Sequence, residues 1–159
     1  MPKIRIVYVT RTGHARALAE EVAKLTGATP ARIVDKVDRG GFIGYIKTAR
    51  QAARSLATPI EDPNVDLAAA DVVVLVQPVW AWSITPPMRS WLQAHKAELV
   101  GKKLGFLATN GGSPGEPLKR KFEKEFGKLT AFAVIHQGDR EAKRSNAIAA
   151  FVAALKQFA

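Results

Sequence analysis

Hydrophobic residues follow two alternating patterns along the whole chain. Short apolar runs, some with polar residues at every second position, predict five strands. Between and after these runs, apolar residues recur three and four positions apart, which is typical of helices with one buried face. The predicted strands span Lys3 to Thr10, Ala31 to Val37, Asp71 to Gln77, Lys103 to Asn110 and Ala131 to Gln137.

The predicted helices begin and end at recognisable residues. A stripe from Ala15 to Leu25 is followed by Gly27, a common helix stop. Thr85, which precedes two prolines, predicts an N-cap and the first turn of a helix that continues through Leu99. Further helical stripes occupy residues 42–56, 118–126 and 148–158.

The alternation of strands and helices predicts an α/β fold. Right-handed crossovers between parallel strands place helices on both faces of a sheet. The 159 residues suit one domain, and no repeat or linker divides them. We therefore expect residues 1–159 to form a single doubly wound domain around a five-stranded parallel sheet.

Composition excludes several classes of protein. The chain has no cysteine, which excludes a disulfide scaffold, a thiolate metal site, an iron–sulfur cluster and a cysteine nucleophile. His14, His95 and His136 are far apart and lack carboxylates at ligand spacing, so no metal site is expected. No apolar run approaches the roughly 18 residues of a membrane span, and the first residues do not resemble a secretory signal. We expect a cytoplasmic protein that does not enter a membrane.

The chain is strongly basic. Lysine and arginine number 24 against 14 acidic residues, which gives a net charge of 24 − 14 = +10 and a pI near 10.2. Such a charge favours acidic proteins, nucleic acid or an anionic cofactor as partners, and it does not distinguish among them.

The first candidate site follows the first strand. Ligands of open α/β sheets bind beyond the carboxyl ends of the strands, where this chain has hydroxyls and a glycine before a helix. The helix N-terminus favours a phosphate, although the threonines could instead serve only as helix caps. The loop matches neither a Walker sequence nor G-x-G-x-x-G, which disfavours a nucleoside triphosphate or a dinucleotide. Its residues are Thr10, Arg11, Thr12, Gly13, His14 and Ala15.

Two further loops end at the same edge of the predicted sheet. The loop after the third strand has two indoles that suit a flat ring system, unless they pack inward. The loop after the fourth strand offers backbone amides without side-chain obstruction, unless it is only a flexible turn. The residues are Pro78, Val79, Trp80, Ala81 and Trp82 in one loop, and Thr109, Asn110, Gly111 and Gly112 in the other.

Together these loops resemble the flavodoxin family over nearly the whole chain. The family's phosphate loop, [ST]-x-T-G-x-[ST], is matched by Thr10, Thr12 and Gly13. V-Q-P-V-W-A-W-S-I-T-P-P-M-R-S-W-L resembles the family's flavin loop and the helix after it, and K-K-L-G-F-L-A-T-N-G-G-S resembles its fourth strand and second flavin loop. No long insertion lies between Gln137 and Ser145, as in the short-chain class. The resemblance implies strand order 2-1-3-4-5 and non-covalently bound FMN.

Three features depart from the family pattern. Ala15 replaces the last hydroxyl of the phosphate loop and so removes a hydrogen bond typically worth about 1.5 to 3 kcal/mol with a charged partner. Trp82 stands where related sequences commonly have glycine, close to the backbone that meets the flavin N5 in flavodoxins. Flavodoxins are also usually acidic, whereas this chain is basic.

The resemblance implies an FMN-binding electron-transfer protein without a catalytic side chain. Thr10 to His14 would hold the phosphate, Trp80 and Trp82 would border the ring, and Thr109 to Gly112 would line its other edge. The expected partners are redox proteins with an acidic docking face, while the oligomeric state stays open.

Two alternatives belong to other functional classes. One is an FMN-dependent NAD(P)H:quinone reductase, which would need room for a second substrate. The other is a flavin-free domain that binds, for example, nucleic acid. No aromatic stacking platform accompanies the charges that would serve it, so nucleic acid is disfavoured. Those charges are Lys47, Arg50, Arg54, Lys119, Arg120, Lys121 and Lys124.

Overall fold

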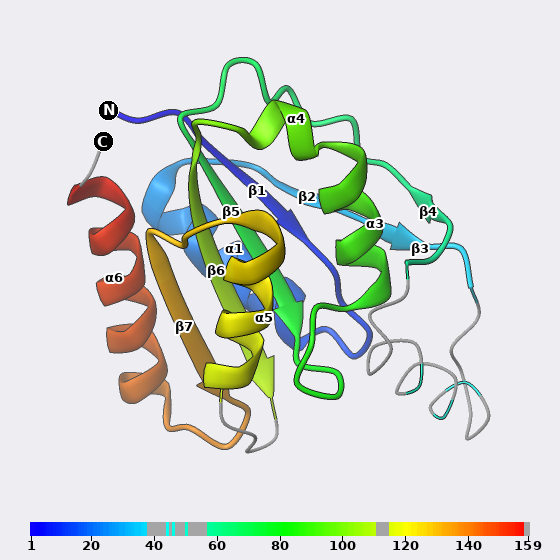
Figure 1. The fold of residues 1–159 in the computed structure, drawn as a ribbon. Helices are drawn as coiled ribbons and strands as arrows, with labels where there is room; N and C mark the ends of the chain where they lie inside the picture. The colour runs from blue at the N-terminus through cyan, green and yellow to red at the C-terminus, as the bar shows by residue number, and fades with distance from the viewer. Residues whose placement is uncertain (38–43, 45, 47–49, 51–56, 111–114, 158–159) are drawn as a thin grey trace.

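A five-stranded parallel sheet forms the centre of the protein. The computed structural model describes residues 1–37, 44, 46, 50, 57–110 and 115–157 (Figure 1). The sheet has the order β2-β1-β5-β6-β7, which is the predicted 2-1-3-4-5 arrangement because β5, β6 and β7 are its third, fourth and fifth strands. The strands are β1 (Ile4–Tyr8), β2 (Pro30–Arg32), β5 (Val72–Pro78), β6 (Lys103–Asn110) and β7 (Ala131–His136).

The second strand is shorter than the sequence predicts. After β2 the chain continues into β3 (Val34–Asp35), which pairs antiparallel with β4 (Ile60–Glu61) in a separate two-stranded sheet. Between β2 and β3, Ile33 is 1% exposed and donates its N–H to the carbonyl of Tyr8. The buried Ile33 therefore separates two pairings that the sequence pattern joined into one strand.

Helices cover both faces of the sheet. In Figure 1, α1 lies behind the strands and α5 lies in front of them. One apolar cluster includes buried residues of α3, α4 and α5, and the other includes those of α1 and α6. The helices are α1 (His14–Thr26), α3 (Pro86–Ala94), α4 (Lys96–Leu99), α5 (Glu116–Phe126) and α6 (Glu141–Gln157).

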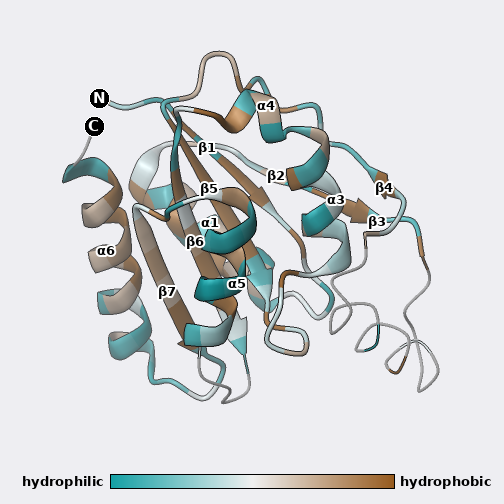
Figure 2. Cartoon of the chain, in the orientation of Figure 1, coloured by the Kyte–Doolittle hydropathy of each residue, from teal (hydrophilic) through white to brown (hydrophobic). Residues whose placement is uncertain are grey.

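The core continues on both sides of β5. Val73 and Leu75 belong to one apolar cluster, whereas Val72, Val74 and Val76 belong to the other. This division follows from the two-residue period of a strand, which points successive side chains to opposite faces. In Figure 2 the strands are accordingly the most hydrophobic part of the ribbon.

Helix ends confirm part of the sequence prediction. Gly27 ends α1 with φ 72° and donates its N–H to the carbonyl of Ala23, and Thr85 caps α3 by accepting the N–H of Met88. The helix after Thr85 stops at Ala94, however, and a separate short α4 follows it. Leu25 also differs from its predicted place on the buried stripe, because it is 47% exposed.

Part of the sequence prediction falls outside the described residues. This applies to most of the helix expected over residues 42–56, including Lys47 and Arg54, and to Phe158. Within that predicted helix, Ile46 and Arg50 are described; both are helical and exposed.

His95, the residue after α3, connects the end of this helix to Asp62, which lies between β4 and β5 in the chain. Its Nε2 lies 2.5 Å from a carboxylate oxygen of Asp62, and its Nδ1 lies 2.7 Å from one of Glu98. Burial alone would lower the pKa of His95, but the hydrogen bonds to the two carboxylates outweigh burial and raise it. Burial likewise opposes the charge of Asp62, whose pKa is nevertheless lowered by the Asn64 N–H and by His95.

The His95 cluster predicts a pH-dependent stability. Because the pKa of His95 is higher in the folded protein than its ordinary value of 6.5, the charged histidine stabilises the fold fully below pH 6.5. This stabilisation is lost as pH rises through the pKa of the folded state. The lowered pKa of Asp62 stabilises the fold above 3.8 and is lost only on further acidification. His95→Gln should therefore lower the free energy of unfolding by about 1 to 2 kcal/mol near pH 5.5 and by less near pH 8.5.

Urea unfolding of the two proteins across this pH range measures the difference. His14→Gln is the matched control, because His14 is exposed at the start of α1. A His95→Gln effect of equal size at both ends of the range would contradict the charged cluster.

Candidate functional site

The three predicted loops meet at one edge of the sheet. β1, β5 and β6 are neighbouring parallel strands, so their carboxyl ends lie together, at the lower edge in Figure 1. Beyond the strand pairing, Val9 donates its N–H to the carbonyl of Val76, and Val79 donates its N–H to the carbonyl of Thr109. The structure therefore brings the loops together as predicted, except that Gly111 and Gly112 lie outside the described residues.

The loop after β1 leaves the start of α1 without a side-chain cap. Gly13 is the N-cap residue with φ 97°, and its N–H donates to Oγ1 of Thr10 at 3.0 Å. Arg11, Thr12 and His14 are exposed. Thr10 thus closes the turn itself and does not cap the first helical turn, whose amides and dipole favour an anion.

Ala15 occupies a different environment from the rest of this loop. Its side chain is 2% exposed and belongs to the apolar cluster under α1, together with Leu18 and Ala19. A methyl group therefore packs inward where the family pattern has a hydroxyl. Since a buried hydroxyl there would need its own hydrogen-bond partner, alanine suits this packing.

The loop after β5 contains a tight turn with two residues in the left-handed region. Ser83 donates its N–H to the carbonyl of Trp80 at 3.1 Å, and Ala81 and Trp82 have φ values of 50° and 51°. Non-glycine residues in this conformation cost on the order of 1 kcal/mol each. The turn leaves Trp82 51% exposed, while Trp80 is half-buried, so an inward-packed Trp82 is wrong.

Gln77 holds both ends of the same loop and was not recognised from the sequence. It is fully buried, its Oε1 accepts from the N–H and the hydroxyl of Thr85, and its Nε2 donates to the carbonyls of Pro78 and Ser83. These bonds are 3.0 to 3.2 Å long and use both donors and both acceptors of the amide. The available signal was one polar residue at the end of the apolar run V-V-V-L-V-Q.

Ser83 carries a buried polar atom without a partner. Its side chain is fully buried, and its Oγ has no hydrogen bond among the described residues. An unsatisfied buried hydroxyl costs about 1 to 3 kcal/mol. Apart from this hydroxyl, the uncapped start of α1 and the two indoles fit a site for a flat ring that bears an anionic group.

The fourth strand, β6, has its predicted bounds, and its last two residues are buried. Thr109 and Asn110 are the last residues of β6 and are 2% and 5% exposed. Oδ1 of Asn110 lies 2.7 Å from Nδ1 of His136, and the carbonyl of Asn110 accepts the N–H of Gln137. These bonds fix Asn110 to the end of β7, so His136 is a second residue at this edge whose place the sequence did not show.

A hollow on the described surface lies at the opposite edge of the sheet, away from the three loops. It has a volume of about 760 Å³ and lies before β5 and β6, where Asp71, Lys102, Lys103 and Lys156 line it. It contains no aromatic residue and none of the predicted site residues. Its size is therefore a poorer guide to function than the chemistry of the three loops.

Two exclusions apply to the described part of the chain. It contains no group of histidine and acidic residues that could hold a metal ion. None of its helices is long and apolar enough to cross a membrane.

Comparisons with known structures support the fold. A flavoprotein from Bacteroides eggerthii is 18% identical, with 98% of this chain and 99% of that chain covered and a TM-score of 0.76. A flavoprotein from Lactobacillus acidophilus, solved in complex with FMN, is 16% identical over 92% and 99% of the two chains, with a TM-score of 0.71. A flavodoxin from Streptococcus pneumoniae is 13% identical over 98% and 99%, with a TM-score of 0.58.

The sequence also matches a protein-family model. No curated protein matches the chain. The model that describes the NADPH-dependent FMN reductases matches residues 8–146, which is most of the chain, and supports FMN as the cofactor that the sequence predicts. The chain belongs to the NADPH-dependent FMN reductase family, one of the flavodoxin-like families of FMN-binding proteins.

Proposed function

We propose that the protein is an electron carrier, which exchanges electrons with redox proteins through FMN bound without a covalent bond. The observation that carries this choice is the 51% exposure of Trp82 beside the three loops. An exposed aromatic at the rim of a ligand site is typical of a surface that another protein covers. A pocket for a small second substrate would instead enclose the ring.

The phosphate of FMN would bind at the start of α1. The uncapped helix N-terminus, the Thr12 hydroxyl and the charge of Arg11 all favour an anion there. Thr10 would hold the turn closed through its bond to Gly13, and His14 would lie beside the phosphate. Ala15 would contribute its backbone N–H only.

The flavin ring would lie between the other two loops. Trp80 and Trp82 would border one side, with Pro78, Val79 and Ala81 shaping the loop, and Asn110 would begin the other side. FMN supplies reversible redox chemistry when bound, so the protein needs to bind and orient it and requires no catalytic acid or base.

The partner would be a redox protein with an acidic docking face. With a net charge of +10, this protein attracts acidic surfaces and repels basic ones at long range. Nucleic acid remains disfavoured for lack of a stacking platform beside the cations of α5.

A second candidate is an NADPH-dependent reductase. The observation that favours it is the description of the family model, because that family is named for reduction at the expense of NADPH. In this role NADPH would reach the flavin directly, without a separate reductase.

The two roles predict different behaviour toward NADPH. The purified protein loaded with FMN should show flavin absorption and release FMN on denaturation. As a carrier, it should stay oxidised with NADPH alone under anaerobic conditions and become reduced when a separate flavodoxin reductase is added. Steady NADPH oxidation by the isolated protein at a rate matching the reductase-coupled reaction would instead establish the second candidate.

The phosphate site predicts a ligand-specific effect. Thr12→Ala should weaken FMN binding by about tenfold, since a hydrogen bond to a charged group contributes about 1.5 kcal/mol or more. Riboflavin lacks the phosphate and should bind with unchanged affinity. Thr29→Ala, at an exposed threonine next to β2, is the matched control. Equal losses for FMN and riboflavin in fluorescence titrations would refute the phosphate assignment.

Substitution of Gln77 should affect FMN and riboflavin binding alike, in contrast to Thr12→Ala. Gln77→Leu keeps a buried side chain of similar size but leaves the polar groups of Thr85, Pro78 and Ser83 without their partner. The ring loop should loosen, so FMN and riboflavin affinities should both fall by about tenfold or more, and unfolding should require about 2 kcal/mol less. The exposed Gln93 provides the control Gln93→Leu. Loss of stability with both affinities intact would mean that Gln77 only supports the fold.

A further inference from the structure

The structure assigns a docking surface for an acidic redox protein to the outward side of α5, which we propose as the place where the carrier meets its partner. We call this surface the α5 basic face; it consists of Arg120, Lys121, Lys124 and Lys128. The inference rests on the proposed carrier function and adds the location and the charge of the contact.

The two acidic residues in the second half of α5 are bonded within the protein. Glu125 forms an ion pair with Nη1 of Arg89 on α3, and Arg89 is 2% exposed. Oε1 of Glu123 accepts the N–H of Leu129 at 3.0 Å, just beyond the helix. Both carboxylates are half-buried, so neither balances the charge on the outer side of α5. Glu116 is exposed, but it lies in the first turn of the helix, where its charge suits the dipole.

The cations of α5 face outward without such partners. All four residues of the α5 basic face are exposed, and among the described residues none has a carboxylate within 4.0 Å. Three cations of α1 and α6 differ in this respect, because Arg16 pairs with Glu20, Lys143 with Asp139 and Arg144 with Glu21. The α5 basic face is therefore a surface whose positive charge is not neutralised locally.

Helix geometry groups these charges on one side. Leu118 and Phe122 are fully buried and direct one side of α5 to the core. With about 3.6 residues per turn, Arg120, Lys121 and Lys124 fall within about a third of the helix circumference, outside the sector of the two buried residues. Lys128 follows in the segment after the helix. The three helical charges thus lie on one side of α5.

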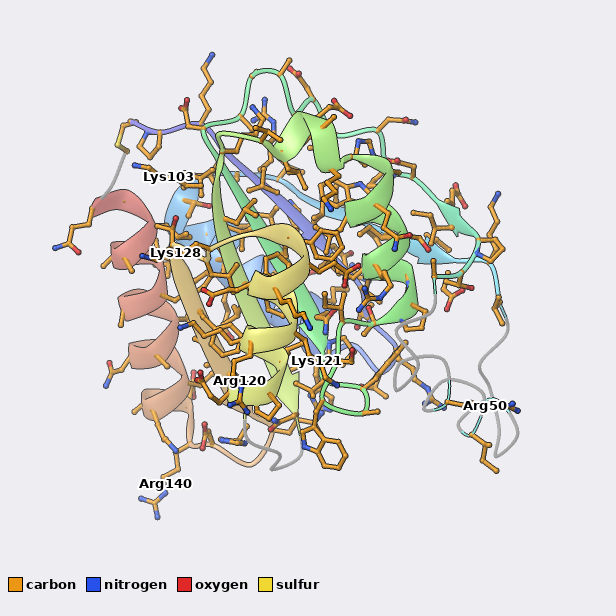
Figure 3. The ribbon with its side chains drawn as sticks, viewed as in Figure 1. Arg50, Lys103, Arg120, Lys121, Lys128 and Arg140 are labelled. Carbon is orange, nitrogen blue, oxygen red and sulfur yellow. The ribbon has the colours of Figure 1, made fainter. Side chains whose placement is uncertain are left out.

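The α5 basic face begins beside the candidate flavin site. α5 follows the loop after β6, and Arg120 is about 6 Å along the helix axis from Glu116. In Figure 3, Arg120 and Lys121 lie on the part of α5 near the carboxyl edge, and the exposed Arg140 lies on the same side, whereas Lys128 lies toward the other end. A partner on this surface would have its redox centre close to the flavin edge.

The chemistry of the surface favours a protein over a nucleic acid. Proteins that bind single-stranded nucleic acid typically combine cations with aromatic side chains on which bases stack. Within α5, Phe122 is buried and Phe126 is half-buried with the Lys96 ammonium 5.7 Å from its ring. The exposed Trp82 lies at the flavin edge, where a protein partner would cover it. The fitting partner presents aspartate and glutamate around its own redox centre.

Charge reversal of the α5 basic face tests the inference. The reduced FMN protein is mixed by stopped flow with an acidic b-type cytochrome or, as a probe of opposite charge, a basic c-type cytochrome. The double variant Arg120→Glu/Lys121→Glu should slow reduction of the acidic cytochrome at low ionic strength by about tenfold or more and should speed that of the basic one. Added salt should diminish both differences.

A matched variant separates local from overall charge. Arg32→Glu/Lys36→Glu reverses an exposed arginine that ends β2 and an exposed lysine just after β3; β2 is the outer strand at the other side of the sheet from β7. Each double variant changes the net charge by the same amount, from +10 to 10 − 4 = +6. The control variant should keep at least half of the unmodified rate. Equal slowing by both variants would overturn the proposed surface.

A binding measurement that does not depend on electron transfer tests the α5 basic face separately from the proposed carrier function. In NMR titrations with the acidic cytochrome, backbone amides of α5 should shift in the unmodified protein and not in the α5 variant, whether or not NADPH reduces the flavin. Shifts confined to other elements would overturn the surface while leaving the carrier role intact. Tighter binding of a labelled single-stranded DNA than of the cytochrome, lost in the α5 variant, would replace the protein partner with nucleic acid.

Discussion

The burial of β5 on both faces is the constraint on which the rest of the structure depends. Val72 to Val76 are fully buried, with their side chains divided between two apolar clusters. A strand in this position cannot expose its polar groups to water, so the chain must satisfy them internally as it leaves the sheet. Gln77 meets this requirement, since one buried amide bonds to both ends of the following loop.

This clamp also explains how an unfavourable turn persists beside the candidate site. Ala81 and Trp82 hold left-handed conformations, and the hydroxyl of Ser83 is buried without a partner. Local strain of this kind survives only where the surrounding structure fixes both ends of the segment. Gln77 and the N-cap Thr85 do so, while the indole of Trp82 stays exposed. Rigid support and an exposed aromatic therefore arise from the same connection between β5 and α3, residues 79–85.

The sequence predicted the sheet order and the meeting of the loops because these depend on strong local patterns and on chain topology. It failed where tertiary contacts decide. Ile33 looked like the middle of a strand, but its burial separates β2 from β3. His95 lay inside a helix predicted to continue through Leu99, whereas α3 ends at Ala94 and His95 forms an ion pair with Asp62, which is distant in the sequence. The bounds of β6 are as predicted, but the sequence did not show that Asn110 is buried there and bonded to His136.

The net charge likewise cannot be interpreted without the structure, because a value of +10 does not say which cations are available to a partner. Beside the large hollow at the amino edge, Lys102 donates to the carbonyl of Ala70, and Lys156 donates to that of Leu25 near the end of α1. Those ammonium groups satisfy backbone carbonyls, so part of their charge serves the fold. On α5 the acidic residues bond within the protein instead: Glu125 and Glu123 support the fold, and the cations face outward. The hydrogen bonds and ion pairs of each lysine, and not the count of lysines in the sequence, therefore distinguish a structural lysine from one that can attract a partner.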